Sequence, residues 1–356
     1  YDGTLPLDGH GANLVSDTRQ VRVRLDAART TALLRDVPSV YRTEINDVLL
    51  AALTPVLSGW TGRERVVIAL EGHGREELFD DVDLSRTVGW FTSYFPVALT
   101  DPGDGDWGRT LKAVKEQVRA IPLRGLGYGA LRYYGADGGG PAGDPLPPVS
   151  FNYLGRFDGT TRAGGLYSAV SGIGLREDRD ATRLHLIDIV GQVVEGELEF
   201  VWSYSAGLHR EETVRRLGEE FVGNLARVVA HCAQPGAGGR TPSDFPSAGL
   251  GQADIDRLLG DGRSVLDVYP LTQMQSGMLF HSLMDQEQGT YQEQISFTLD
   301  GVHHPDLLEA AWQRVVDREP VLRTSLVWDG LPEPLQVVHT AVRCPVTRLD
   351  WSALDE

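Results

Sequence analysis

The chain has 356 residues, 41% of them hydrophobic and 23% charged, a composition typical of globular proteins. This length is enough for one large domain or roughly two to three ordinary ones. A formal net charge of −17 argues against a nucleic-acid partner and against an anionic membrane surface. The two cysteines, Cys232 and Cys344, are too few and too widely spaced for a disulfide framework or a zinc site.

No apolar run approaches the roughly 20 residues that cross a bilayer, so we expect no membrane span. No signal peptide opens the chain, and Tyr1 stands where an initiator Met is expected. The low cysteine content fits a reducing compartment, and we expect a cytoplasmic protein. We also expect the chain to be an excerpt of a longer protein.

The first hundred residues alternate strands and helices after an aperiodic start over 1–18. Gln20–Leu25 alternates polar and apolar residues, as in a half-buried strand. Asp26 can cap a helix that runs to about Arg35, and Thr43 starts a stronger helix with an apolar stripe. Two strands are then predicted around a charged loop, over Arg65–Glu71 and Thr87–Leu99.

The next part of the chain predicts a helix over Trp107–Ile121, with Lys112, Lys115 and Arg119 on its outer face. A glycine-rich turn follows at Arg124–Gly129, but it lacks the spacing of a phosphate-binding loop. A strand is then predicted over Pro148–Leu154, and a hairpin over Arg183–Val190 and Glu197–Tyr204. A long amphipathic helix over Glu211–Cys232 ends this part of the chain.

Composition shifts after this helix. Residues 234–249 are rich in Pro and Gly, and we expect a linker over 236–265 that buries little. A short helix, Ala253–Leu259, lies within it. A second unit is then predicted. Its helices are Thr272–Met284 and His304–Arg318, and its strands are Gln292–Leu299 and Leu322–Trp328.

Candidate chemistry lies at the end of the apolar strand 65–71. Glu71 can be a general base whose pKa is raised by a buried setting, or simply a solvated loop residue. Gly72 and Gly74 permit a sharp bend or a close approach of the backbone to a ligand. Arg75 can pair with Glu71 or hold an anion, and His73 between the glycines is a base or a structural residue.

A second set of candidates lies on the strand 148–154. Asn152 and Tyr153 are neighbours on it, so they point to opposite faces, and one of them can face a ligand. The alternative for Tyr153 is an interface aromatic with a satisfied hydroxyl group. Trp90, Phe91 and Tyr94 are expected on a strand, either packed in the core or lining a channel.

The stretch E-G-H-G-R-E at 71–76, followed by R-T-V-G-W-F-T-S-Y-F-P at 86–96, resembles the epimerization domain of nonribosomal peptide synthetases. This domain is a branch of the condensation-domain superfamily. T-E-I-N-D-V-L-L-A-A-L (43–53), R-A-I-P-L-R-G-L-G-Y-G (119–129) and P-V-S-F-N-Y-L-G-R-F-D (148–158) match its pattern in the same order. T-P-S-D-F-P (241–246) is similar to the tail that leads into the next domain.

The second unit resembles the start of a condensation domain, through V-Y-P-L-T-Q-M-Q-S-G-M-L-F-H-S-L (268–283) and A-A-W-Q-R-V-V-D-R-E-P-V-L-R-T-S-L (310–326). The superfamily's hallmark, H-H-x-x-x-D-G, is absent. His303-His304 continues as P-D-L-L-E and reads as the start of a helix. The resemblance places the hallmark before Tyr1 for the first unit and after Glu356 for the second.

The resemblance implies an α/β fold of chloramphenicol-acetyltransferase-like lobes, each a mixed sheet with flanking helices, incomplete at both ends. It assigns residues 1–235 to the C-terminal lobe of an epimerization domain, 236–265 to a linker, and 266–356 to the beginning of the N-terminal lobe of a condensation domain. The implied activity is L-to-D epimerization of an aminoacyl or peptidyl thioester, feeding a condensation domain that accepts a D-configured donor. Amide-forming condensation and a non-catalytic scaffold are the alternatives.

Glu71, Arg75, Asn152 and Tyr153 are the candidate catalytic residues under this resemblance, with a histidine of the missing motif as the second acid/base group. Peptidyl carrier protein domains, upstream and downstream, and the remainder of the synthetase are the implied partners. The phosphopantetheine arm belongs to the carrier, so no cofactor and no metal is expected on this chain. We expect the isolated fragment to be inactive.

Overall fold

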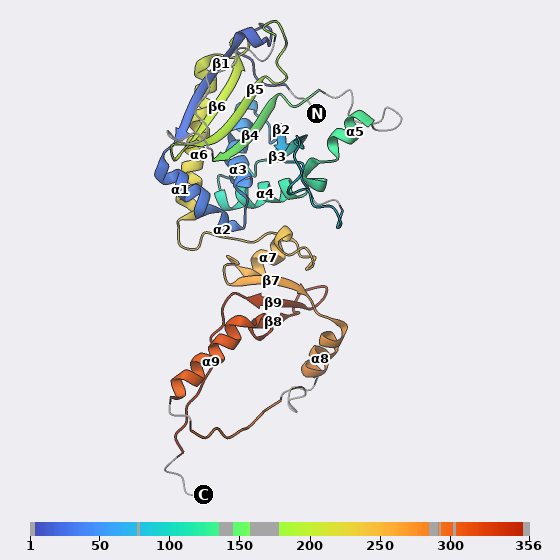
Figure 1. Ribbon diagram of the computed structural model, residues 1–356, viewed down its shortest axis with the longest axis vertical. Helices are drawn as coiled ribbons and strands as arrows, with labels where there is room; N and C mark the ends of the chain where they lie inside the picture. Colours follow the sequence, from blue (N-terminus) through green and yellow to red (C-terminus); the bar gives the residue numbers. More distant parts are fainter. Residues whose placement is uncertain are drawn as a thin grey trace. The chain divides into compact units, whose positions relative to one another are not determined.

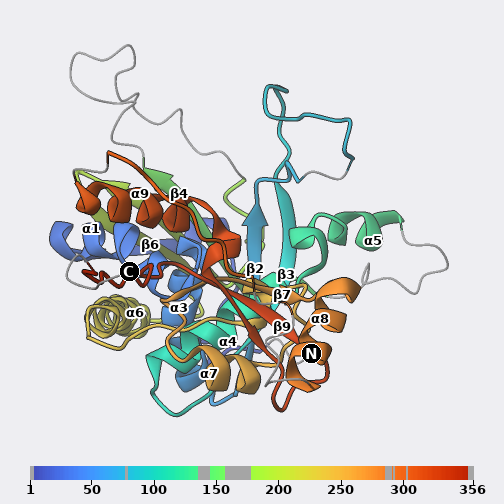
Figure 2. The ribbon, with the colours of Figure 1, turned by 90° about the horizontal axis from the view of Figure 1, so that it is seen from below.

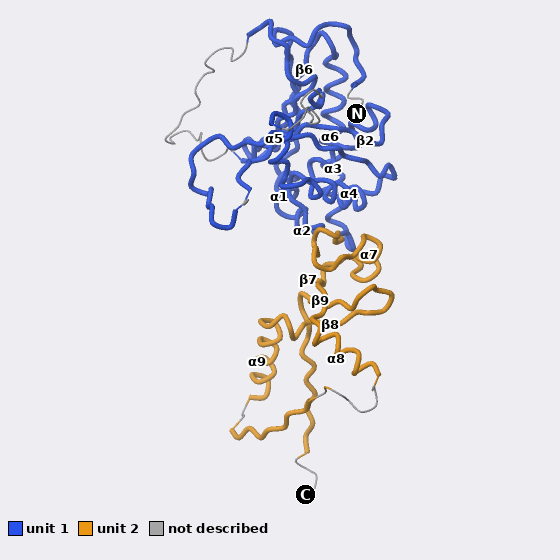
Figure 3. The backbone as a smooth tube through the Cα atoms, turned by 90° about the vertical axis from the view of Figure 1, so that its right-hand side faces the viewer, with its two compact units in different colours: residues 1–238 blue, residues 239–356 orange. Residues whose placement is uncertain are grey.

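The computed structural model describes residues 4–76, 79–134, 145–156, 178–284, 291, 293–301 and 304–351. Two compact units divide the chain, residues 1–238 and residues 239–356 (Figure 3). The first unit holds the candidate residues.

A six-stranded mixed sheet forms the first unit, in the order β1-β6-β5-β4-β2-β3 (Figure 1). The pairs β2–β4 and β4–β5 are parallel, and the other neighbours are antiparallel. The strands are β1 Thr18–Leu25, β2 Arg65–Gly72, β3 Ser93–Thr100, β4 Val149–Arg156, β5 Ile187–Val194 and β6 Glu197–Ser205.

Helices cover the apolar face of this sheet, with α3 and α6 packed against each other (Figures 1 and 2). Asp26 caps α1 through a bond from the Arg29 backbone N–H, as the sequence predicts. Among the described residues the helices are α1 Ala27–Arg35, α2 Val37–Tyr41, α3 Ile45–Thr61, α4 Trp107–Arg119, α5 Tyr128–Tyr134 and α6 Glu211–Cys232; the 3₁₀ turns are η1 Val15–Asp17 and η2 Pro122–Gly125.

The core of the first unit is aromatic at its centre. Phe200 and Trp202 on β6 and Phe221 on α6 are fully buried, and the rings of Phe200 and Phe221 meet edge to face at 4.7 Å. Alternation along β1, β5 and β6 supplies the apolar residues that face these helices. The sheet is thereby fixed against α3 and α6, with β4 at its centre and β2 between β4 and the edge strand β3.

Two predictions about the first unit are wrong. The second strand begins at Ser93 and not at Thr87, because residues 87–92 make no sheet pairing and Trp90 is 90% exposed. Lys115 is fully buried instead of facing out, because α4 packs between other elements and the Lys115 Nζ donates to the Tyr41 carbonyl oxygen at 2.8 Å. The short helices α2 and α5 were not predicted.

The second unit has a three-stranded antiparallel sheet in the order β7-β9-β8. Two of its strands, β7 and β9, were not predicted. Its elements are η5 Pro242–Asp244, α7 Gln252–Leu259, β7 Val265–Pro270, α8 Gln273–Met284, α9 Pro305–Arg318, η6 Pro320–Arg323, β8 Thr324–Val327 and β9 Leu335–His339.

Two predictions about the second unit are also wrong. The expected linker over 236–265 is packed, since Phe245, Ile255 and Val265 are buried in one cluster with β9. Its Pro and Gly residues shape tight turns around those apolar anchors. Gln292 lies outside the described residues, and 293–299 form no strand. Within the described parts of the chain, no helix is long and apolar enough to cross a membrane.

Candidate functional site

The sheet register brings Glu71, Tyr94 and Asn152 into one row. Glu71 on β2 lies directly opposite Tyr94 on the antiparallel strand β3. On the other side, β2 pairs in parallel with β4 through Ala69–Ser150 and Leu70–Phe151, so the next position sets Glu71 beside Asn152. Residues at matched positions share a face of the sheet. A carboxylate, a phenol and an amide therefore meet at the ends of these strands.

A cavity of about 850 Å³ opens at this point. Its volume falls within the range of about 300–1,000 Å³ that is usual for small-molecule sites. Among the described residues, the lining comes from α3, β2, the β2–β3 connection, β3, α4, η2 and β4. It consists of Glu44, Asn46, Asp47, Leu50, Leu70, Glu71, Gly72, His73, Glu76, Trp90, Thr92, Phe95, Val118, Arg119, Ile121, Arg124, Asn152, Tyr153 and Leu154. The structure thus brings Glu71, Asn152 and Tyr153 together.

The Glu71 carboxylate is oriented by a neighbouring side chain and reaches the cavity. The Asn152 Nδ2 donates to the Glu71 Oε2 at 2.6 Å and fixes the orientation of the carboxylate. Burial raises the pKa of the Glu71 carboxyl, and the charge of nearby His185 opposes this rise. A carboxylate with a raised pKa accepts a proton more readily than one in water, and Glu71 reaches the cavity.

Two glycines form tight turns next to cavity-lining residues. Gly74 has φ +65°, and a Cβ there would lie 1.6 Å from the Phe91 carbonyl oxygen. Gly125 has φ +80°, and its Cβ would lie 2.1 Å from the Phe95 ring. The preceding Arg124 also has a positive φ of 48°, a costly conformation that surrounding contacts must maintain. Both turns therefore require glycine.

Arg75 does not pair with Glu71. Its Nη1 donates to the Leu84 carbonyl oxygen at 2.7 Å, and its guanidinium group stacks over the Phe91 ring at 4.4 Å. The loop after Gly74 turns this side chain away from the strand end, and Arg75 is not among the described lining residues. The structure therefore gives Arg75 contacts within the β2–β3 connection, which extends from the sheet in Figure 2.

The other candidates occupy different positions around the cavity. Tyr153 lines it, and burial raises the pKa of its phenol, which favours the neutral, hydrogen-bonding form. His73 also lines it, but its Nδ1 accepts from the Arg75 backbone N–H at 3.0 Å and its Nε2 lies 3.3 Å from the Glu76 Oε1. His73 is thereby built into the loop.

Sequence reasoning missed Asp47 as a site residue. It is 2% exposed, lines the cavity, and accepts from the Glu44 backbone N–H at 2.8 Å in the first turn of α3. Burial raises its pKa to about 6. The motif T-E-I-N-D contained the signal, because a Glu and an Asp separated by three positions at a helix start form a capping box.

His185 is a second residue that the sequence did not reveal. It is buried just before β5, and its ring contacts Tyr94 through a hydrogen bond between Tyr94 Oη and His185 Nε2. Its Nδ1 bonds to the Pro147 carbonyl oxygen at 2.7 Å. This pair lies beside Glu71, and a positive charge on the His185 ring, when it is protonated, lowers the pKa of that carboxyl.

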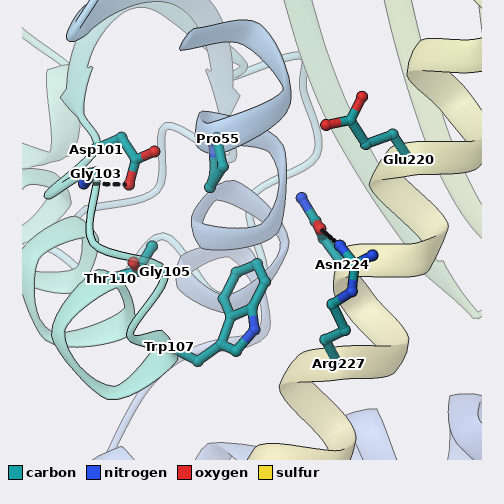
Figure 4. Close-up of a pocket in the computed structure, with 9 residues that line it drawn as sticks. All are labelled: Pro55, Asp101, Gly103, Gly105, Trp107, Thr110, Glu220, Asn224 and Arg227. Atoms are coloured by element: carbon teal, nitrogen blue, oxygen red, sulfur yellow. Dashed lines mark hydrogen bonds between the residues drawn. The ribbon is translucent and has the colours of Figure 1, made fainter. Parts of the chain in front are cut away.

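A second cavity of about 320 Å³ lies between α3, α4 and α6 (Figure 4). Asn224 and Arg227 project into it from α6 and are joined by a 2.8 Å hydrogen bond. None of the candidate catalytic residues lines it. Across the described residues, no group of three or more His, Cys, Asp or Glu side chains is placed to hold a metal ion.

A mixed sheet with flanking helices is the α/β, chloramphenicol-acetyltransferase-like lobe that the resemblance implied, and the cavity that holds Glu71 opens at its edge. The condensation-domain family model matches residues 4–250 and 265–356. The chain belongs to the condensation-domain family, and the resemblance to nonribosomal peptide synthetases is confirmed.

Similar proteins include very long synthetases. One component of the linear gramicidin synthase of Brevibacillus parabrevis is 45% identical over 356 residues, covering 98% of this chain and 7% of that protein. Another component of the same synthase is 46% identical over 342 residues, covering 95% of this chain and 4% of that protein. The chain thus spans less than 10% of the length of either.

A solved relative matches about two thirds of the chain. The crystal structure of the epimerization domain from the third module of tyrocidine synthetase B has a TM-score of 0.58 and 35% sequence identity. The match covers 64% of this chain and 52% of that one. The predicted fold, a mixed sheet with flanking helices, is confirmed.

Proposed function

We propose that the first unit contributes to L-to-D epimerization at the α-carbon of a carrier-bound aminoacyl or peptidyl thioester. The observation that carries this proposal is the Glu71 carboxylate, oriented by Asn152 at 2.6 Å and exposed to a cavity of about 850 Å³. Its raised pKa supports a role as a proton acceptor. The 35% identity with an epimerization domain supports the same reaction.

In the proposed step, Glu71 takes the α-proton, and the electrons of the C–H bond move into the thioester carbonyl to form an enolate. The second acid/base group then gives a proton to the opposite face of the α-carbon, and proton exchange with water restores the Glu71 carboxylate and the proton of that group. The family resemblance assigns the opposite face to the histidine motif expected before Tyr1. Two acid/base groups on opposite faces give net inversion with no change in oxidation state.

The neighbouring residues have supporting roles in this proposal. Asn152 positions Glu71, and the neutral Tyr153 hydroxyl group is available to donate to the thioester or enolate oxygen. Arg75 holds the β2–β3 connection through Leu84 and Phe91, so its effect on the reaction is indirect.

Condensation-family domains act within multidomain synthetases on substrates attached to the phosphopantetheine arm of a carrier domain. We propose that carrier domains upstream and downstream are the partners of this chain, in a cytoplasmic synthetase. The second unit would begin a condensation domain that receives the D-configured product, since the family model matches 265–356 separately.

Deuterium wash-in at the substrate α-carbon tests the proposal in the intact synthetase. We expect Glu71→Gln to abolish exchange while carrier binding persists, because the amide cannot accept the proton. Glu197→Gln, a carboxylate on β6 outside the cavity, is the matched control and should exchange normally. Unchanged exchange in Glu71→Gln would exclude Glu71 as the base. An amide product without wash-in would favour condensation, and neither reaction would favour a scaffold.

A further inference from the structure

The hydrogen bond between the half-buried Tyr94 and the buried His185 has a defined direction. The Pro147 carbonyl oxygen can only accept, so the His185 Nδ1, at 2.7 Å, carries a hydrogen. In the neutral ring, Nε2 is then the acceptor, and the Tyr94 hydroxyl group donates to it. The hydrogen of the Tyr94 hydroxyl is thereby directed toward His185.

Glu71 is the carboxylate that faces Tyr94 across the strand pair. Tyr94 lies directly opposite Glu71 across β2 and β3, where side chains on one face are neighbours. The Glu71 charge contributes to the raised pKa of the Tyr94 phenol, after burial and the charge of Asp188. Within the described residues, Asn152 is the side chain recorded as donating to Glu71.

We propose that His185 is a positioning residue that keeps the Tyr94 hydroxyl from donating to Glu71, so that Glu71 remains a strong proton acceptor. A second donor would stabilise the ionised carboxylate and weaken it as a base. The catalytic consequence rests on the function proposed above, whereas the hydrogen-bond arrangement itself does not.

Other charges near the pair are paired or lie across the cavity. Asp188 on β5 binds Arg183 at 2.6 Å and accepts from the Ser150 hydroxyl at 2.6 Å. These contacts fix Asp188 independently of Tyr94. The titratable and charged groups that line the cavity with Glu71 are Glu44, Asp47, His73, Glu76, Arg119, Arg124 and Tyr153. None of them changes in the variants below, so they contribute equally to each comparison.

Titration of Glu71 in the 356-residue chain, labelled with ¹³Cδ-glutamate and followed by NMR, tests the inference without a reaction. The signal missing from Glu71→Gln identifies Glu71. We expect the Glu71 midpoint in His185→Phe to lie about one pH unit below that in the double variant Tyr94→Phe/His185→Phe, a tenfold change in proton affinity. Comparing these two variants isolates the hydroxyl group, because both lack the imidazole charge.

Two further variants serve as controls. His185→Gln retains an acceptor for the Tyr94 hydroxyl group. Its Glu71 midpoint should therefore lie within a few tenths of a pH unit of the Glu71 midpoint in the double variant. If the phenyl ring unfolds the chain, His185→Met replaces it as an apolar side chain without an acceptor. Equal midpoints in the single and double variants would overturn the inference.

The acid limb of the exchange rate in the intact synthetase gives the second readout. It should move to lower pH in His185→Phe and return when Tyr94→Phe is added. A midpoint shift in the chain without any exchange in the synthetase would leave the inference standing and refute the proposed function. Exchange that depends on Glu71 but has the same acid limb in both variants would refute the inference alone.

Discussion

Replacing Asp47 with asparagine should stabilise the first unit at neutral pH. Asp47 lies in the first turn of α3, 2% exposed, and its Oδ2 accepts from the Glu44 backbone N–H at 2.8 Å. Burial is the largest influence on this carboxyl and raises its pKa from 3.8 to about 6. Asparagine has the same shape, keeps an acceptor for that N–H, and cannot ionise.

The sign and the size of this stability change follow from the difference between the Asp47 pKa values in the folded and unfolded chain. Below about pH 4 the Asp47 carboxyl is protonated in both states, and its contribution to stability is fully present. Between pH 4 and pH 6 the unfolded chain loses this proton first, so stability falls as the pH rises. A rise of about two pKa units corresponds to about 3 kcal/mol, which is lost by pH 7.

Urea unfolding of the wild-type chain and Asp47→Asn, measured from pH 4 to pH 7, gives this difference. We expect the variant to exceed the wild type by up to about 3 kcal/mol at pH 7 and to equal it near pH 4. A pH-independent difference, or a less stable variant at pH 7, would refute the reasoning. Asp47 also lines the cavity, so the stabilised variant tests whether its charge serves the reaction.

Asp26→Asn is a matched control at the start of another helix. The pKa of the Asp26 carboxyl is lowered, chiefly by the hydrogen bond from the Arg29 backbone N–H. Its stabilising contribution is therefore present at neutral pH and is lost as the pH falls through the folded pKa. The two asparagine variants should change the pH dependence in opposite directions.

Two further substitutions test the site and the core. Asn152→Ala removes the 2.6 Å hydrogen bond that orients Glu71. Because a hydrogen bond to a charged group contributes about 1.5–3 kcal/mol, α-carbon exchange in the synthetase should slow by about 10- to 100-fold. Exchange at the wild-type rate would exclude this positioning role. Phe221→Ala leaves a cavity at the centre of the aromatic core. In urea titrations it should reduce the free energy of unfolding of the first unit by about 3–5 kcal/mol, and a loss below about 1 kcal/mol would contradict the packing described.

The sequence predicted those elements whose burial follows one regular period. The helix α6 has the predicted bounds Glu211–Cys232. The predicted hairpin is formed by β5 and β6, but its first strand is Ile187–Val194 and not Arg183–Val190. Lys115 shows where periodicity fails, because α4 is covered on more than one side and a lysine finds a backbone acceptor inside. Composition failed in the same way over 236–265, where a few apolar anchors outweigh many Pro and Gly residues.

The candidate site was predictable only where its signal is local in the sequence. Glu71 lies at the end of an apolar strand, a local signal that the sequence contains. Its bond to Asn152 joins residues 81 positions apart and depends on the parallel pairing of β2 with β4, which no local pattern specifies. Of the two alternatives for Arg75, the pairing with Glu71 is not formed, because the chain turns at Gly74 and the side chain contacts Leu84 and Phe91 instead.

Register links these observations into one arrangement. A shift of one residue between β2 and its neighbours would move Glu71 to the helix-covered face, away from both Tyr94 and Asn152. The buried contacts of Leu70 with Phe95, and of the aromatic core beneath them, resist such a shift. The packing of the apolar face therefore determines which polar groups meet on the other face, and the basicity proposed for Glu71 depends on core residues that never touch a substrate.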